Sequence, residues 1–254
     1  MGRGRFEAEF GCYTEWLAEA CAALQLDPVP AVSRGTGRPA LLELVADRLD
    51  VTPGHKVIDL GCGLGGPTTW LARTTGAEVV GVDVMLQSVA GLRRLIPGQR
   101  AVVASMRALP MPDGAFDRAW SLGVLEMVSD KPTAIGEIWR VLSPGGRFVV
   151  YDFVLTGEVP EHIPQADRFS PPEDTLSYLE EAGFVIEEAD RLPVLPATPP
   201  DWVAARDAVR DEVRRLHGDD ARHEIVEKEL EMFRRLVTNK VIDEWIFVAS
   251  KEGT

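Results

Sequence analysis

The sequence predicts an α/β fold with a doubly wound, seven-stranded, mostly parallel sheet. Segments typical of strands and helices alternate from residue 56 to residue 154, which is the pattern of parallel strands joined by crossover helices. The strands are near-continuous runs of Val and Ile, as expected where helices cover both faces of a sheet. A glycine-rich turn follows the first strand, and this end of an open α/β sheet is where ligands bind.

The expected strands are short apolar runs that alternate with helical segments. They cover residues 56–60, 78–83, 101–105, 116–122, 146–154, 184–192 and 244–250. The expected helices cover residues 5–25, 40–49 and 130–142. One further helix begins with residues 67–73, and another follows the second strand and ends near residue 96. The Pro- and Gly-rich segment 27–39 is interpreted as a loop. Ser170 and Glu173 form an S-x-x-E capping box for a helix that ends near residue 183.

About fifty residues separate the last two strands, which would otherwise form a terminal hairpin with an antiparallel last strand. A Pro-rich linker, 193–200, precedes two amphipathic helices. The apolar face of the first carries Trp202, Val209, Val213 and Leu216, and that of the second carries Val226, Leu230, Phe233 and Val237.

An insertion of this length beside a ligand-binding edge often forms a lid. We therefore expect a single domain over residues 1–254. It would consist of an N-terminal helical cap (1–50), a cofactor-binding core (51–155) and a helical lid before the last strand (193–241).

Composition excludes several classes of protein. The 254 residues carry a formal net charge of -13, which disfavours binding to nucleic acid or to an anionic membrane. Three cysteines and four scattered histidines predict neither a disulfide framework nor a metal site. No apolar run is long enough to span a membrane, and the N-terminus lacks a secretory h-region. We expect a cytoplasmic protein whose oligomeric state, with a homodimer as one option, stays open.

The stretch VIDLGCGLGGPTTW follows the first expected strand and matches two patterns at once. Gly61, Gly63 and Gly66 fit G-x-G-x-x-G, the fingerprint of dinucleotide-binding loops. Asp59 and Gly65 extend a second match, D-x-G-x-G-x-G. In both patterns the glycines let the backbone turn tightly and approach a ligand, so they leave the identity of the ligand open.

Two acidic residues narrow the choice of ligand. Asp59 ends the first strand, where a carboxylate disfavours a pyrophosphate and favours a cationic ligand. Asp83 ends the second strand, 22 residues after Gly61, where an acid reaches a ribose diol. Asp83 alone fits NAD as well as an adenosyl ligand.

Two later stretches, ASMRALPMPDGAFDRAWSLGVLEMV and WRVLSPGGRFVVYDF, complete a pattern that resembles class I S-adenosylmethionine-dependent methyltransferases. The resemblance covers roughly residues 40–155 and then the terminal strands. The loop GLGGP is most similar to members that methylate small molecules, including natural products and other metabolites. The resemblance implies a Rossmann-like fold, S-adenosylmethionine as cofactor, S-adenosylhomocysteine as product and a small-molecule substrate.

The resemblance also implies a role for each matching residue of the first loop. Asp59 would act through nearby backbone or water on the amino end of the cofactor. Gly61, Cys62 and Gly63 would line its methionine and ribose portions. Asp83 would accept hydrogen bonds from both ribose hydroxyls.

The adenine would be held by the next two loops. Val84 and Met85 would lie against the ring, Met106 would cover it, and Ser105 or Arg107 would lie near its amino group. Many relatives have an Asp where Ser105 or Met106 stands, so adenine recognition would rest here on backbone groups. At the end of the fourth strand, the backbone of Leu122 would contact the methionine portion.

The fourth-strand motif departs from the family pattern. Many relatives have His after the glutamate, whereas Met127 follows Glu126 here. The strand ends in SLGV, while methyltransferases that act on amino groups of nucleic acids carry D/N-P-P-Y/F there. The sequence therefore argues against DNA or RNA bases as substrates.

Methyl transfer from a sulfonium needs alignment and a dry site, and a general base only where the nucleophile must lose a proton. The candidates are His162 in the loop after the fifth strand, Glu126, and Tyr13 on the first helix. Tyr151 and Asp152, near the end of the fifth strand, are candidates for substrate contact. Each has an alternative, purely structural interpretation.

His217 and His223, at the junction of the two inserted helices, are expected at the surface. The function predicted is methyl transfer from S-adenosylmethionine to O, N or C of a small, fairly apolar metabolite. Two alternatives stay open. One is an enzyme that uses the same bound cofactor for cyclisation or decarboxylation, and the other is a regulatory protein that binds the cofactor without turnover.

Overall fold

The computed structural model of the chain describes residues 3–33, 36–158 and 168–253, with side chains from residue 10 onward in the first segment. Its centre is a seven-stranded sheet in the order β3-β2-β1-β4-β5-β7-β6. Strands β1 to β5 run parallel, and β7 lies antiparallel between β5 and β6. This sheet confirms the predicted fold class.

The elements follow one another along the chain as the alternation predicted. The strands are β1 (Lys56–Leu60), β2 (Glu78–Asp83), β3 (Arg100–Val103), β4 (Phe116–Leu122), β5 (Leu142–Leu155), β6 (Phe184–Arg191) and β7 (Ile242–Lys251). The helices are α1 (Arg3–Ala23), α2 (Pro28–Val32), α3 (Pro39–Leu49), α4 (Gly66–Thr75), α5 (Leu86–Leu95), α6 (Lys131–Val141), α7 (Pro172–Glu181), α8 (Pro200–His217) and α9 (Ala221–Thr238). A 3-10 turn, η1 (Leu125–Met127), follows β4.

Helices cover both faces of the sheet because successive strand residues point to opposite sides. In β2, Val79 packs with α3 and α4, while its neighbour Val80 belongs to the cluster on the other face with α6 and α7. In β5, Val149 and Val150 divide in the same way. Strands β2 and β5 are therefore covered on both faces, which explains their continuous runs of Val and other apolar residues.

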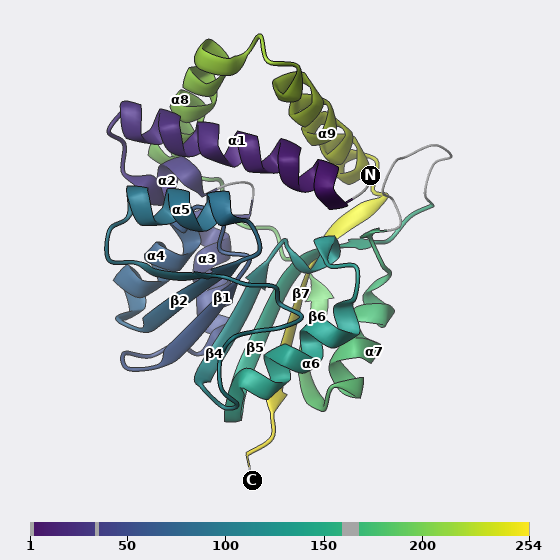
Figure 1. Cartoon of the computed structure of the whole chain (residues 1–254). Coiled ribbons are helices and arrows are strands. Elements are labelled where there is room, and N and C mark those ends of the chain that lie inside the picture. Colours follow the sequence, from purple (N-terminus) through teal and green to yellow (C-terminus); the bar gives the residue numbers. More distant parts are fainter. Residues whose placement is uncertain (1–2, 34–35, 159–167, 254) are drawn as a thin grey trace.

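A third layer lies beyond one end of the sheet. Helices α1, α8 and α9 lie together there, next to α2 and α5 (Figure 1). Val209 and Val213 of α8 and Val226 of α9 are fully buried against the side of α1 that carries Leu17. We call these three helices the cover. Among the described residues, no helix is both long and apolar enough to cross a membrane.

Three local predictions were wrong. Segment 27–39 is not all loop, because Asp27 caps α2 by accepting a hydrogen bond from Val29 N (3.2 Å) and Pro28 starts the helix. No capping box forms at Ser170, since α7 starts one residue after Pro171 and has no side-chain cap. Leu216 does not share the buried face of α8 and is 39% exposed.

Candidate active site

The loop between β1 and α4 places three glycines in the left-handed region of backbone space. Gly61, Gly63 and Gly65 have φ values of 83°, 53° and 80°, which other residues rarely adopt. The carbonyl oxygen of Val82 accepts hydrogen bonds from the N–H groups of Gly61 (2.7 Å) and Cys62 (3.0 Å). The loop is thus held against the end of β2.

Asp83, the last residue of β2, joins this loop to the next one. Its Oδ2 accepts a hydrogen bond from Gly63 N (2.9 Å), and its Oδ1 accepts one from Met85 N (2.8 Å). Burial raises the pKa of Asp83, and hydrogen bonds from Met85 N, Gly63 N and the Ser88 side chain oppose the rise. A carboxylate has about four acceptor positions, so Asp83 can still accept a hydrogen bond from a ligand.

The space around these groups fits an adenosyl ligand. A Cβ built on Gly63 meets no atom within 4 Å, so the loop is open on that side. Val84, Leu86 and Val103 are exposed beside Asp83, which is unusual for apolar residues at strand ends. An apolar wall next to a carboxylate with free acceptor positions suits a purine and its ribose.

Asp59 and Cys62 point into the protein. Asp59 Oδ2 accepts a hydrogen bond from Thr68 Oγ1 (2.5 Å) on α4. Burial raises the pKa of Asp59 to about 6, although the Thr68 hydrogen bond lowers it. The Cys62 side chain lies against Gly81 of β2, and burial raises the pKa of its thiol well above the ordinary value. Neither side chain offers a charge to a ligand, so only their backbone lines the loop.

The third loop and the end of β4 complete this edge of the sheet. Ser105 Oγ accepts a hydrogen bond from Arg107 N (3.2 Å), which forms a tight turn after β3. Met106 is buried in the cluster under α6, and Leu122 is buried on the opposite face. The turn after β4 lies against the glycine loop, because a Cβ on Gly61 would be 2.5 Å from the side chain of Val124. Val124 was not among the predicted contacts.

Two of the three predicted catalytic candidates are described. Glu126 lies buried in η1, and its carboxyl group is hydrogen-bonded to that of Asp152 in β5. The pairing was missed, although β4 and β5 are adjacent in any such sheet and both acids were noted singly. Tyr13 is buried in the cover, with its ring 6.4 Å from that of Trp16. His162 lies outside the described residues.

The expectation that both cover histidines lie at the surface was wrong. His223 is buried, with its ring 6.4 Å from that of Tyr13. His217 is half-buried and stacks on Trp16 at 4.6 Å. Both imidazole rings pack against aromatic side chains of α1. The residue periodicity of α8 and α9 alone could not predict these contacts. Tyr151 is also withdrawn from the site, because its hydroxyl donates to Glu244 inside the protein.

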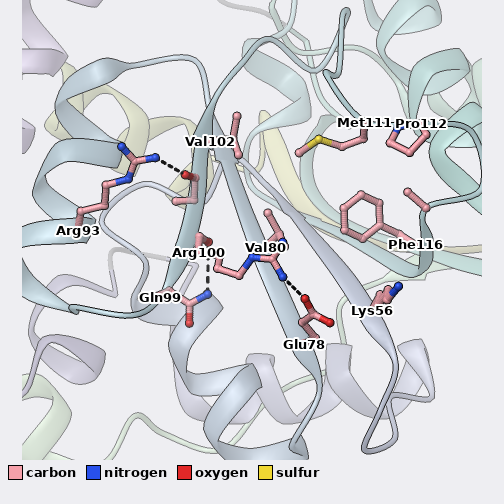
Figure 2. A pocket seen from close by; sticks show the side chains of 12 residues that line it. Lys56, Glu78, Val80, Arg93, Gln99, Arg100, Val102, Met111, Pro112 and Phe116 are labelled. Atoms are coloured by element: carbon pink, nitrogen blue, oxygen red, sulfur yellow. Dashed lines mark hydrogen bonds and ion pairs between the residues drawn. The ribbon is translucent and has the colours of Figure 1, made fainter.

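A cavity of about 570 Å³ lies elsewhere, at the amino ends of β1 to β4 (Figure 2). Figure 2 shows Val80, Val102 and Phe116 around an apolar floor, with Arg100 paired to Glu78 at the rim. The glycine loop and Asp83 lie at the carboxyl ends of their strands, so this cavity is not their ligand site. Within the described ranges, no group of His, Cys, Asp and Glu side chains is arranged to hold a metal ion.

Comparison with known proteins agrees with this geometry. Residues 58–150 match a family model described as "Methyltransferase domain". The chain is 37% identical over 123 residues to methyltransferase GfsG of Streptomyces halstedii, covering 46% of this chain and 44% of that protein. The chain spans about half the length of the curated relatives it matches.

Solved structures share the fold over most of the chain. The [4+2]-cyclase SpnF is 26% identical, with a TM-score of 0.66 over 84% of this chain and 81% of that chain. Geranyl diphosphate C-methyltransferase of Streptomyces coelicolor A3(2), solved with S-adenosyl-L-homocysteine, is 20% identical. Its TM-score is 0.62 over 84% of this chain and 75% of that chain. Residues 58–150 of the chain are therefore similar to a methyltransferase domain, within a fold that the chain shares with these solved structures.

Proposed function

We propose that this chain binds S-adenosylmethionine at the β1–α4 loop and transfers its methyl group to a small metabolite. The observation that carries the proposal is the arrangement of Asp83, which bridges Gly63 and Met85 and can still accept a hydrogen bond from a ligand. The match of residues 58–150 to a methyltransferase domain supports the same reading.

The roles in cofactor binding follow from the positions of the loops. Asp83 would accept hydrogen bonds from both ribose hydroxyls, with the backbone of Gly61 to Gly63 along the ribose and methionine portions. Asp59 would act indirectly, by fixing the start of α4 through Thr68.

The adenine would rest between the second and third loops. Val84 and Met85 would face one side of the ring, and the turn of Ser105 to Arg107 would present backbone groups to its amino group. Met106 is buried, so its side chain would support the wall of the adenine pocket from behind. Leu122 would contribute its backbone beside the methionine portion.

For methyl transfer, the protein must align the substrate with the cofactor and exclude water from the site. The cofactor supplies a methyl group on a sulfonium, which is reactive without further activation. The cover would exclude water, because α1 packs over α5 and over Leu64 of the glycine loop. We infer that the cap (1–50) and the inserted helices (193–241) close one shared pocket over the core (51–155), and that Tyr13 stiffens this cover.

The test is calorimetric titration of the full chain with S-adenosylmethionine, S-adenosylhomocysteine and NADH. The proposal predicts binding of the two adenosyl ligands and none of NADH. Release of S-adenosylhomocysteine, with gain of one CH₂ unit by an added metabolite, would then establish methyl transfer. Binding of NADH alone would contradict the proposal.

A second function, cyclisation on the same fold, is favoured by the similarity to the [4+2]-cyclase SpnF. Under this alternative the substrate would rearrange at constant mass, and no S-adenosylhomocysteine would form. The same mass spectrum therefore separates the two functions.

A further inference from the structure

A buried pair of carboxyl groups lies where β4 and β5 end. Glu126, in η1, is 6% exposed, and Asp152, in β5, is 4% exposed. The two carboxyl groups are hydrogen-bonded to each other. Two adjacent carboxylates away from water do not both stay ionised, so one of them holds a proton.

The charges around the pair are balanced when it holds one proton. Lys131 of α6 and Arg168 contribute positive charges, and Glu229 of α9 faces Arg168. Lys131 Nζ donates to the carbonyl oxygen of Arg168 (3.2 Å), which ties these cations together. With one shared proton the pair carries one negative charge, and Glu229 adds a second, so the two cations are matched. Burial and the neighbouring Glu126 carboxyl raise the pKa of Asp152 well above its ordinary range, which favours a proton shared within the pair.

One oxygen of the pair is left free. Glu126 Oε2 is buried and has no hydrogen-bond partner among the residues that the structure describes. A buried acceptor without a donor is costly, and the natural solution is a donor from a ligand. Val124, two residues earlier in the same turn, lies against the glycine loop at Gly61. The free oxygen is therefore on a turn that borders the proposed cofactor site.

We propose that the Glu126 carboxylate accepts the proton that a substrate hydroxyl loses on methylation, while the hydrogen bond with Asp152 holds this carboxylate in place. This inference rests on the proposed methyl transfer. The oxygen–methyl bond forms as the methyl–sulfur bond breaks, sulfur keeps the bonding pair, and the hydroxyl proton moves to Glu126. Glu126 is then the catalytic residue and Asp152 a positioning residue.

The same arrangement names the substrate class. An amine attacks with a free lone pair and needs no base before transfer, whereas a hydroxyl is a poor nucleophile until its proton leaves. The substrate class that the arrangement indicates is accordingly a hydroxyl compound.

The shared proton is tested by infrared difference spectroscopy of the full chain at neutral pH, which needs no substrate. We expect the band of a protonated carboxyl group in the wild type and its loss in both Glu126→Gln and Asp152→Asn. Glu224→Gln and Asp47→Asn, at exposed positions, are the matched controls and should keep it. Absence of the band in the wild type overturns the inference, whatever the stability of the variants, and so does its persistence in both.

The proton transfer is tested with matched phenols and anilines as methyl acceptors, by measuring S-adenosylhomocysteine. We expect transfer to phenols, a roughly 10²- to 10⁴-fold lower kcat in Glu126→Gln at unchanged KM, and a shifted pH profile of kcat in Asp152→Asn. Transfer to anilines alone, or equal kcat in Glu126→Gln, overturns the inference. Failure to bind S-adenosylhomocysteine would instead refute the proposed function, so the two failures are distinct.

Discussion

Asp83 has both carboxylate oxygens engaged by backbone N–H groups from two different loops. A carboxylate can do this because it only accepts, whereas an amide side chain carries donors on one arm. The residue therefore shapes the loops even before any ligand arrives. The two carboxylate oxygens of Asp83 thus hold the two loops in place and are also the atoms proposed to bind the ribose.

Asp83→Asn should weaken binding of S-adenosylhomocysteine. The new NH₂ group would face an N–H donor, and hydrogen bonds to a charged acceptor contribute about 1.5–3 kcal/mol each. The expected loss is roughly 10- to 150-fold in Kd, measured by calorimetry. Asp47→Asn, on the exposed side of α3, should bind like the wild type. Equal affinity of the Asp83 variant would exclude a direct ribose contact.

Asp59 should make the protein less stable as pH rises. Its pKa is about 6 in the folded chain against 3.8 ordinarily, so between these values the unfolded state is ionised while the folded state keeps its proton. Stability falls across that window by about 3 kcal/mol in total and is level above it. Asp59→Asn removes this loss and keeps an acceptor for Thr68. In urea unfolding, the difference in the free energy of unfolding between Asp59→Asn and the wild type should grow from about pH 4 to about pH 6. A difference that stays constant over this range would contradict the raised pKa of Asp59.

Several residues of the site were predictable from the sequence, and others depend on contacts that no local pattern contains. Gly61, Gly63 and Asp83 follow from spacing alone, because strand ends and turns impose them. The inward turn of Asp59 depends on Thr68, nine residues away on a helix. The position of His223 depends on rings from α1. Such partners are set by packing between elements.

At the scale of elements, strands were predicted best. Strands β1, β2 and β4 have the bounds that their apolar runs indicated, since burial on both faces leaves a continuous signal. Helix α2 was missed because Pro and Gly dominate its surroundings, yet Asp27 and Pro28 are favourable residues for a helix start. The start of α7 was misplaced because Pro172, not Ser170, sets its first turn.

Gly66 explains how α2 and α4 pack together. It has an ordinary helical φ, so conformational freedom is not its purpose, but an added Cβ would collide with Ser33 and approach Val29 O of α2. Its match to the dinucleotide fingerprint thus reflects helix packing. Gly66→Ala should destabilise the chain by about 1–3 kcal/mol in urea unfolding, as overpacking does.

Gly136, inside α6, is the matched control. A Cβ there meets no atom within 4 Å, so Gly136→Ala should stabilise the chain by about 0.4–1 kcal/mol by restricting the unfolded state. Opposite signs for the two substitutions would support the packing role of Gly66. The same sign for both would refute it.

The whole molecule consists of the sheet with its flanking helices and of the cover. Leu64 of the glycine loop belongs to the cluster of the cover, whereas its neighbour Cys62 packs under the sheet edge. Loosening the cover should therefore disturb the glycine loop more than the strands.

Val226→Asp should test this division, because it places an unpaired charge at a fully buried position between α9 and α1. We expect faster hydrogen exchange in α1, α8 and α9, with the amides of β1, β4 and β5 still protected. Val194→Asp, at a fully exposed position in the linker before α8, should leave exchange unchanged. A uniform rise across the strands would mean that the cover and the sheet unfold as one unit.

The place of β7 between β5 and β6 has a consequence for how the chain is made. Strand β5 ends at Leu155, and its antiparallel partner starts at Ile242, so these two strands can pair only after α8 and α9 have been synthesised. Until then the newly made sheet carries an open, apolar edge, which is a template for association with other chains. Pairing over so long a separation is slow. We expect nascent chains that stop before β7 to be held by chaperones, and release to coincide with the arrival of that one strand.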